Sequence, residues 1–316
     1  MVAADIDVTV ELARELLAEQ HPDLAGLPLE VVANGWDNVM LRLGPLPDGG
    51  HLALRLPRRD AAAHLIDHEQ AALPRLAPAL EATGITFPVP VRTGRPSARL
   101  GFPWSWNVVR WVDGVAAART AVAGRTAWAA ELARFLVALH VPADDAPPNP
   151  FRGIPLAARP DAQDPAVFAA RLERVPEERR DAATRLWHES LDAPAYSGAP
   201  VWLHGDPHPG NLVVREPADG TQELAAVVDF GDVTSGDPAS DLGAAWLTFD
   251  ADGHARFRAA VDAGARDGRG WDEATWTRAK GWALMYATTM LAHPDEHPWL
   301  VPIGEHGLRR LLADAG

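Results

Sequence analysis

The patterning of the chain changes near Gly114, and this change limits the folds that the chain can adopt. Before it, short apolar runs alternate with glycine, proline and asparagine, a pattern typical of strands and turns. After it, apolar residues recur at helical spacing over longer segments. A chain of 316 residues is long enough for two cores. The sequence therefore predicts an α+β, bilobal fold, with a small β-rich lobe over 1–112 and a larger, mainly helical lobe over 113–316.

Individual elements follow from the same periodicities. In the first lobe, we expect helices from Val8 and from about Ala61, the second broken near Pro74, and strands over 29–44 (two around a bend), 51–57 and within 87–112. In the second lobe, we expect helices over 126–142 and 166–191 and two short apolar strands, at 201–203 and up to 230, with the run NLVV (211–214) following the first. The segment after 230 is expected to be helical.

Composition and charge exclude several classes of function. The formal net charge of −14 repels phosphate backbones, so nucleic acid and anionic membranes are not expected partners. With no cysteine, disulfides and thiolate metal sites are impossible. The first residues lack a basic start followed by an apolar stretch, so we expect a cytoplasmic protein. Because Lys280 is the only lysine, a mechanism that usually employs lysine must use arginine here.

Two polar motifs each follow an apolar run. HGDPHPGN, starting at His204, places Asp206 and Asn211 five residues apart, and VVDFGD places Asp229 after a strand. Carboxylate and carboxamide oxygens on neighbouring loops suit Mg²⁺, which prefers hard oxygen ligands. Asp206 can then accept a proton from a hydroxyl. This combination is typical of phosphoryl transfer, which depends mainly on positioning and charge neutralisation.

The two motifs together resemble those of a known family. H-x-D-x-x-x-x-N followed by D-F-G is similar to the protein-kinase signature. The form found here, with Gly205 after the histidine and a His-Pro-Gly-Asn run, more closely resembles the aminoglycoside phosphotransferase family of small-molecule kinases. The resemblance extends over roughly 29–291. It implies a protein-kinase-like fold, Mg²⁺ as cofactor, ATP or GTP as co-substrate between the lobes, and a small-molecule hydroxyl acceptor.

The resemblance also assigns roles in the second lobe. Asp206 matches the catalytic base, and Asn211 and Asp229 match the magnesium ligands. His204 matches a residue that shapes the catalytic loop. Asp241 resembles an aspartate that hydrogen-bonds back to that loop, although capping of the following helix is an alternative.

The first lobe carries the expected nucleotide contacts. Arg55 replaces the usual lysine as the cation that meets the phosphates, and Glu69 is its helical partner. The bend over 34–38 is expected to cover the phosphates with backbone N–H groups between Gly35 and Asn38, or else to be an ordinary hairpin turn. The resemblance places backbone groups of Arg110 and Val112 against the nucleobase. Arg58 and Arg59 are expected to be solvated.

Alternatives remain open at this point. His204 and His208 have the spacing of a helical zinc site, but the prolines around them disfavour a helix. The acceptor could be an aminoglycoside, a macrolide or a metabolite such as an amino alcohol or sugar. Acidic residues that could bind a polycation are Asp250, Asp252, Asp262, Asp267, Asp272 and Glu273. A protein kinase, disfavoured because no A-P-E motif follows D-F-G, and a catalytically silent binding module are the rivals.

Overall fold

The structure is a computed structural model that describes residues 4–35, 37–143, 145–216, 220–265, 268–292 and 294–313. Trp36, in the predicted bend, and Asp267, among the acidic candidates, lie outside the described residues. The chain divides into two units, one of residues 1–78 with 86–113 and the other of residues 79–85 with 114–316. The first is built around a sheet and the second is mainly helical, so the predicted α+β class is confirmed.

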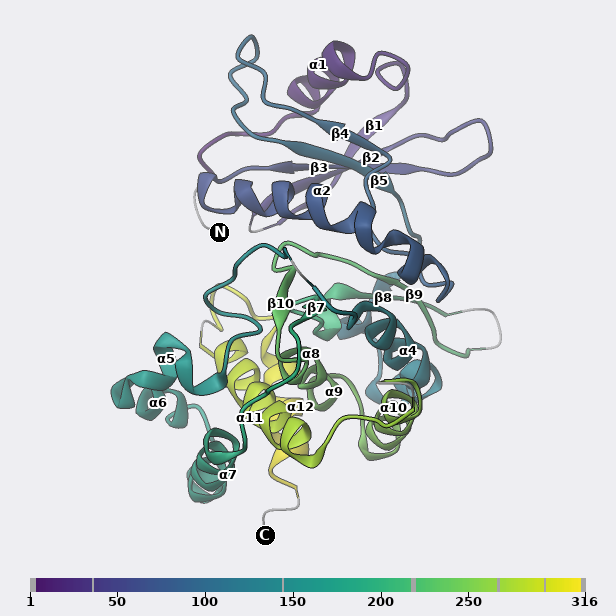
Figure 1. The fold of residues 1–316 in the computed structure, drawn as a ribbon. Coiled ribbons are helices and arrows are strands. Elements are labelled where there is room, and N and C mark those ends of the chain that lie inside the picture. The colour runs from purple at the N-terminus through teal and green to yellow at the C-terminus, as the bar shows by residue number, and fades with distance from the viewer. Residues whose placement is uncertain are drawn as a thin grey trace. The chain divides into compact units, whose positions relative to one another are not determined.

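The first unit is a five-stranded antiparallel sheet with strand order β1-β2-β3-β5-β4 (Figure 1). Its elements are α1 (Val10–Gln20), β1 (Leu29–Asn34), β2 (Asn38–Leu43), β3 (Leu52–Pro57), α2 (Asp60–Glu81), β4 (Arg92–Gly94) and β5 (Trp106–Arg110). Along β2, buried and half-buried residues alternate, whereas all six residues of β3 are buried. β3 is buried on both faces because α1 packs on one face and α2 lies on the other.

The expected break at Pro74 is wrong, since α2 continues through both Pro74 and Pro78. A proline inside a helix removes one hydrogen bond and frees the carbonyl four residues earlier. Both prolines are exposed and lie four residues apart on one face of the helix, so water can satisfy the freed carbonyls. The opposite face carries Leu73 and Leu76, whose burial stabilises the helix across both positions.

The second unit is organised around α11. Its helices are α3 (Val122–Arg125), α4 (Ala129–Leu139), α5 (Pro160–Gln163), α6 (Pro165–Leu172), α7 (Arg180–Asp192), α8 (Ala239–Leu242), α9 (Ala244–Thr248), α10 (Ala251–Gly264), α11 (Glu273–Met290) and α12 (Val301–Leu311). Most residues of α11 are buried on all sides, as expected of a central helix. It contacts α7, α8, α9 and α12 (Figure 1).

Two small sheets in this unit carry the polar motifs. Their strands are β6 (Val115–Ala116), β7 (Val201–Leu203), β8 (Leu212–Arg215), β9 (Glu223–Val227) and β10 (Thr234–Gly236). β7 pairs with β10, and β8 lies between β6 and β9. The expectation that the chain is helical after 230 is therefore wrong at β10, because pairing with the buried strand β7 holds this short segment extended.

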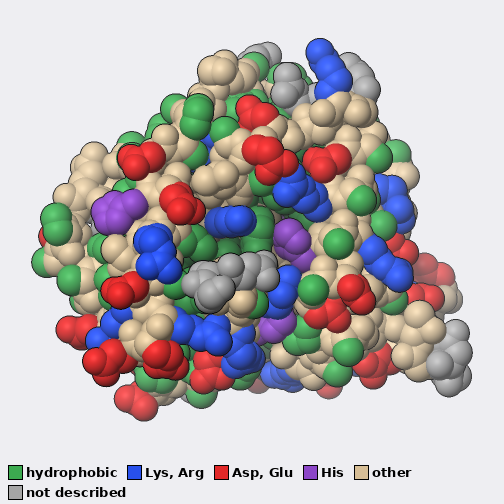
Figure 2. All heavy atoms as spheres, turned by 90° about the horizontal axis from the view of Figure 1, so that it is seen from below, with side chains coloured by type: hydrophobic (Ala, Val, Ile, Leu, Met, Phe, Trp, Pro, Cys, Tyr) green, Lys and Arg blue, Asp and Glu red, His purple; other side chains and the backbone are tan. Residues whose placement is uncertain are grey.

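On the face drawn in Figure 2, acidic and basic side chains both occur and many lie next to one another. No helix in the described part of the chain combines the length and the apolar character needed to cross a bilayer.

Candidate active site

His204 lies immediately after β7, and its ring joins two loops. Its Nε2 lies 3.0 Å from the carbonyl oxygen of Val228, and its Nδ1 accepts a hydrogen bond from the backbone N–H of Asp206 at 3.2 Å. Because Nδ1 is an acceptor, Nε2 is the nitrogen that donates to this carbonyl. The buried ring thus holds the segment that carries Asp206 against the segment that follows β9. With both nitrogens occupied in a non-helical loop, the geometry offers no helical zinc site.

Asp241 anchors the backbone of the same loop. Its fully buried carboxylate accepts hydrogen bonds from the N–H groups of His204 and Gly205, both at 2.9 Å. The Nε2 of His140 lies 3.1 Å from the same carboxylate. Asp241 is the third residue of α8 and does not cap it, so the capping alternative is wrong. The oxygen that accepts from the first N–H of this helix, at Ala239, belongs to Asp237.

Gly205 allows the two polar loops to touch. Its φ of 87° lies in the left-handed region, where a side chain is strained. A Cβ at this position would lie 2.3 Å from the carbonyl oxygen of Asp232. The close approach therefore requires glycine, and it brings Asp206 next to the segment of Asp229 and Asp232.

Asn211 and Asp229 lie at one end of the β8–β9 hairpin. Leu212 pairs with Val227, and the N–H of Val228 donates to the carbonyl oxygen of Asn211 at 2.9 Å. Asp229 follows directly and has a φ of 65°. Among the described residues, it is the one residue other than glycine with a positive φ. Such a conformation costs about 1–3 kcal/mol and is typical of functional sites, where it redirects a side chain.

The donor set of this hairpin end fits a hard cation. The Nδ2 of Asn211 donates to the backbone oxygen of Asp206 at 2.9 Å, which leaves Oδ1 as the atom that can bind a metal. The Asp229 carboxylate supplies further oxygens. Two such side chains, with water and substrate oxygens completing the octahedron, are what Mg²⁺ requires. Within the described ranges, no three His, Asp or Glu side chains form a metal-binding group, so a fully protein-made cage is not seen there.

Asp206 has a basic group beside each carboxylate oxygen. Nη2 of Arg152 lies 3.6 Å from Oδ1, and Nε2 of His208 lies 3.4 Å from Oδ2. The Nδ1 of His208 accepts from the N–H of Gly210, so its Nε2 carries the proton that faces Asp206. Burial opposes ionisation of Asp206, but His208 and Arg152 together hold the pKa of this carboxyl well below its usual range. The carboxylate is therefore ionised and able to accept a hydrogen bond from a hydroxyl.

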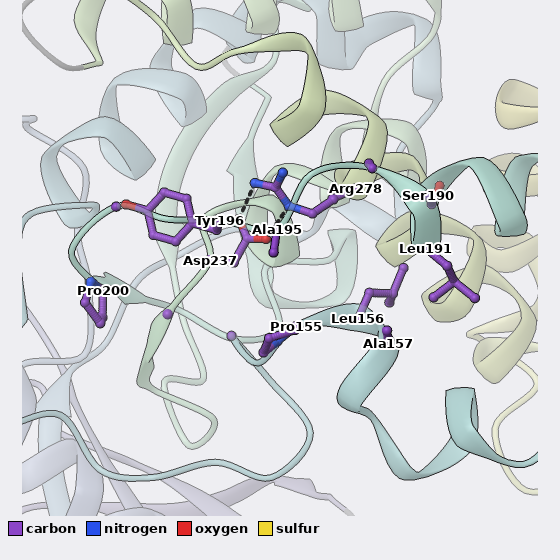
Figure 3. Close-up of a pocket in the computed structure, with 14 residues that line it drawn as sticks. Pro155, Leu156, Ala157, Ser190, Leu191, Ala195, Tyr196, Pro200, Asp237 and Arg278 are labelled. Atoms are coloured by element: carbon purple, nitrogen blue, oxygen red, sulfur yellow. Dashed lines mark hydrogen bonds and ion pairs between the residues drawn. The ribbon is translucent and has the colours of Figure 1, made fainter.

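A buried ion pair fixes the segment beyond β10. Nε of Arg278 lies 2.6 Å from Oδ2 of Asp237, and Nη2 lies 3.2 Å from Oδ1 (Figure 3). The pair borders a cavity of about 210 Å³ whose other walls are mainly apolar, from Pro155 and Leu156 among others (Figure 3). Because the backbone N–H of Asp237 also donates to the carbonyl of Gly153 at 2.9 Å, the pair braces the loop that carries Arg152.

Comparison with known proteins identifies the family. The model of the phosphotransferase enzyme family (APH) matches residues 28–282, most of the chain. The chain belongs to this family. The family expected from the two motifs is confirmed, and so is the expected class of enzyme, a phosphotransferase. No curated protein matches the sequence significantly.

Solved structures of similar fold cover nearly the whole phosphotransferase. The GDP and kanamycin complex of APH(2")-IIia matches with a TM-score of 0.62 and 18% identity, over 96% of this chain and 99% of that one. Macrolide 2'-phosphotransferase MphH from Brachybacterium faecium matches at 0.58 and 21%, over 96% and 98%. The streptomycin–ATP–APH(2")-IIa ternary complex matches at 0.56 and 17%, over 95% of each chain. At these identities the likeness establishes the fold.

The nucleotide candidates of the phosphotransferase lie in its first unit. Arg55 on β3 pairs with Glu69 on α2, and both side chains are buried. Asn107 on β5 donates to the second carboxylate oxygen of Glu69 at 3.4 Å. With the amide of Asn38 turned so that its oxygen faces Arg55, that oxygen accepts from Nε and Nη2 at 3.2 Å. Arg55, Glu69 and Asn38 are therefore brought together.

The described residues of the bend, 34–35 and 37–38, are exposed or half-buried and are held by two arginines that follow β3. The expectation for Arg58 is wrong, because its side chain is buried and donates to Oδ1 of Asn34 at 2.7 Å and to the carbonyl of Gly35 at 3.2 Å. Arg59 is also not simply solvated, since it pairs with Asp37 at 3.2 Å. The N–H of Gly35 donates to the carbonyl of Asn38 at 2.9 Å, so this backbone donor is used within the bend.

The other two nucleotide candidates lie at the end of β5. Arg110 is exposed and pairs with Leu52 across the sheet, and Val112 is half-buried two residues later. Their backbone groups are not tied to the cluster around Arg55 by any hydrogen bond described for the first unit.

Sequence reasoning alone does not single out Arg152 or Tyr286. Arg152 lies in an irregular proline-rich segment, and Tyr286 occupies one of many apolar positions on α11. The hydroxyl of Tyr286 donates to the carbonyl of Gly205 at 3.0 Å. No local motif predicts either contact, because both join segments that are far apart in the chain.

Proposed function

We propose that the protein transfers the γ-phosphoryl group of a nucleoside triphosphate to a hydroxyl of a small molecule, with Asp206 as the catalytic base. The observation that carries the proposal is the carboxylate of Asp206, ionised and held on a loop whose backbone N–H groups are fixed by Asp241. The same loop is tied through Asn211 to the end of the β8–β9 hairpin that carries Asp229.

The chemistry follows from these positions. The acceptor hydroxyl donates a hydrogen bond to Asp206, which orients it and takes its proton. As the acceptor oxygen bonds to the γ-phosphorus, the bond from that phosphorus to the β,γ-bridging oxygen breaks and the nucleoside diphosphate leaves. A strongly basic group is not needed, because the transition state of phosphoryl transfer is loose and the proton moves late. Oδ1 of Asn211 and the carboxylate of Asp229 would hold Mg²⁺. When bound, the metal would neutralise charge on the phosphate oxygens.

The first unit supplies the nucleotide contacts in this proposal. Arg55 would meet the α- and β-phosphates, and Glu69 would hold the guanidinium in place. The bend that includes Gly35 and Asn38 would lie over the phosphates, and the backbone of Arg110 and Val112 would meet the base. We assign nucleotide binding to residues 1–112 and catalysis and acceptor binding to residues 113–316, in a cytoplasmic enzyme. The nucleotides named with the similar structures, GDP and ATP, leave both donors as candidates.

An antibiotic is the preferred acceptor. The similar structures include complexes with kanamycin and streptomycin and a macrolide 2'-phosphotransferase. Two large aromatic residues are among the exposed apolar side chains of the described chain, namely Phe151 and Trp299, each about half exposed. Trp299 lies with its ring centre 6.0 Å from that of His208, beside the proposed base. Exposed aromatic surface at this place supports an acceptor with an apolar face, such as a macrolide.

The experiment is a coupled assay of nucleoside-diphosphate release across macrolides, aminoglycosides, amino alcohols and sugars, with ATP and with GTP. We expect acceptor-dependent release with at least one antibiotic, and phosphorylated product by mass spectrometry. Release only with amino alcohols or sugars would reassign the acceptor to metabolism. Phosphate incorporation into proteins alone would indicate a protein kinase. Nucleotide binding without turnover on any acceptor would indicate a binding module and contradict the proposal.

A further inference from the structure

Arg152 is a cation shared by two carboxylates on two different loops. Its Nη2 lies 3.6 Å from Oδ1 of Asp206 and 3.5 Å from Oδ2 of Asp232. Asp206 belongs to the loop after β7 and Asp232 to the loop after β9. Without a cation between them, these two carboxylates would repel each other across the point where Gly205 lets the loops touch.

The guanidinium group of Arg152 is held in position by Tyr286 as well as by the two carboxylates. It lies over the ring of Tyr286 at 5.1 Å, a cation–π arrangement. The hydroxyl of Tyr286 in turn donates to the carbonyl of Gly205. Burial opposes the charge on Arg152, but the ionisable groups around it, Tyr286, Asp206 and Asp232 first among them, raise its pKa above the ordinary value. Asn149, three residues earlier, donates to Asp232 at 2.8 Å and fixes the second carboxylate.

The backbone that carries Arg152 is held from the opposite side. The carbonyl of Gly153 accepts from the N–H of Asp237, whose carboxylate is paired with Arg278 at the edge of the cavity (Figure 3). Gly236 packs directly on Gly153, where a Cβ on Gly236 would lie 2.0 Å from the carbonyl oxygen of Gly153. The support therefore runs from α11 through Asp237 and Gly153 to Arg152.

We propose that Arg152 is a positioning residue for phosphoryl transfer, which aims the carboxylate of Asp206 at the acceptor hydroxyl by pairing with Asp206 and Asp232 together. This inference rests on the proposed function, because it gives Asp206 the role of base. Arg152 acts through Asp206 and is not assigned a contact with the substrate.

The first test is the R152A variant, measured against the wild type with the best acceptor found in the assay above. We expect kcat to fall about 10²-fold, the usual effect of a misplaced catalytic group. The KM values for nucleotide and acceptor are expected to change by no more than about twofold, since Arg152 is not assigned a contact with either substrate. Far-UV circular dichroism of R152A and the wild type is the check that the variant is folded.

Rescue separates positioning from a merely structural role. Guanidinium ion at a non-denaturing concentration should restore part of the kcat of R152A, because it can bind between the two carboxylates that the variant leaves unpaired. R152K should have an intermediate kcat, since an ammonium keeps the charge near both carboxylates but lacks the planar guanidinium that stacks on the ring of Tyr286. If R152A is unfolded, a lowered kcat of R152K with unchanged KM supports the inference, and a wild-type kcat contradicts it.

Arg258 supplies a matched control. It also lies over an aromatic ring, that of Trp276 at 4.9 Å, and pairs with Asp262 at 3.6 Å. R258A should keep the wild-type kcat and respond to guanidinium no differently from the wild type. A folded R152A with wild-type kcat, or one whose loss guanidinium cannot restore in any part, overturns the inference alone. A wild-type enzyme with no turnover on any acceptor overturns the proposed function and this inference with it.

Discussion

At the scale of single residues, the buried hydrogen bonds of Asp241 and the buried Arg55–Glu69 ion pair have different energetic roles. Asp241 accepts two backbone N–H groups, which is a strong way to fix a loop because the donors are themselves part of the loop. Arg55 and Glu69 instead compensate each other's charge within the first unit. Removing one member of such a pair leaves the other charge buried and unpaired.

The pair predicts a large effect of E69Q on stability. Arg55 is 7% exposed and Glu69 is fully buried, so E69Q should lower the free energy of unfolding by about 3–5 kcal/mol. Urea unfolding of the variant and the wild type measures the difference. E30Q is the control, since Glu30 pairs with Arg42 at 3.8 Å on the surface, and such pairs contribute about 0–1 kcal/mol. Equal, small losses in the two variants would contradict the account of the buried pair.

The sequence can predict the candidate site residues that lie within short motifs, but not those that are placed by contacts between distant segments. Asp206, Asn211 and Asp229 are identifiable because their spacing within two short motifs is typical of phosphoryl transfer. Arg152 is not, because its position depends on the packing of a loop that is remote in sequence. Arg58 shows the same limit, since its burial under the bend depends on hydrogen bonds to residues more than twenty positions away.

At the scale of elements, glycine contacts decide how closely the loops of the second unit can pack. β10 ends at Gly236, which has a φ of 154° and lies against Gly153. Both residues line the cavity beside the Asp237–Arg278 pair. The position of the Arg152 loop therefore depends on β10 carrying no side chain at its last residue.

We expect G236A to destabilise the protein by about 2 kcal/mol or more, because its methyl group overlaps backbone that cannot move without breaking the bond from Asp237. The matched control is G101A. Gly101 also has a positive φ, of 65°, but nothing lies within 4 Å of a Cβ there. G101A should lower the free energy of unfolding by only about 1 kcal/mol, because alanine is strained in the left-handed conformation. Thermal unfolding compares them, and an equally small loss in G236A would refute the packing argument.

The elements themselves were predictable to different degrees. Long periodic segments such as α4 and α11 are evident from the spacing of apolar residues. β10 is three residues long and contains glycine, so its extended form depends on pairing with β7 rather than on local preference. The continuation of α2 through Pro74 likewise depends on the exposure of one helix face, which the sequence alone does not determine.

At the scale of the whole molecule, two histidines, His254 and His306, link stability to pH. His254 on α10 lies against the ring of Trp246, and its Nε2 has no hydrogen-bond partner among the described residues. Burial, followed by the charges of Arg310, Arg258 and Lys280, lowers its pKa from 6.5 to about 4. Between these values, the unfolded chain binds a proton that the folded protein does not, so stability rises with pH.

We therefore expect the free energy of unfolding to fall as the pH is lowered from 6.5 to 4, with His254 contributing up to about 3 kcal/mol of the loss. H254F should flatten this part of the curve while leaving a smaller slope from His306, whose pKa burial also lowers. Urea unfolding at several pH values measures both curves. Identical slopes for H254F and the wild type would contradict the assignment.

The family was predictable because the motifs at 204–211 and 229–232 indicate it, and the α+β class because strand-like patterning gives way to helical spacing near Gly114. The acceptor was not, because no motif in the sequence indicates it and aromatic residues such as Trp299 resemble core residues in sequence. Acidic composition is equally uninformative, since acidic and basic side chains both occur on the face drawn in Figure 2.

The most direct test of the account is acceptor-dependent turnover of D206N, which removes the carboxylate charge from residue 206 but keeps its shape. With circular dichroism and thermal unfolding close to those of the wild type, we predict a loss of kcat of about 10²–10⁴-fold. A folded D206N enzyme that transfers phosphoryl groups at the wild-type rate would show that residue 206 is not the base.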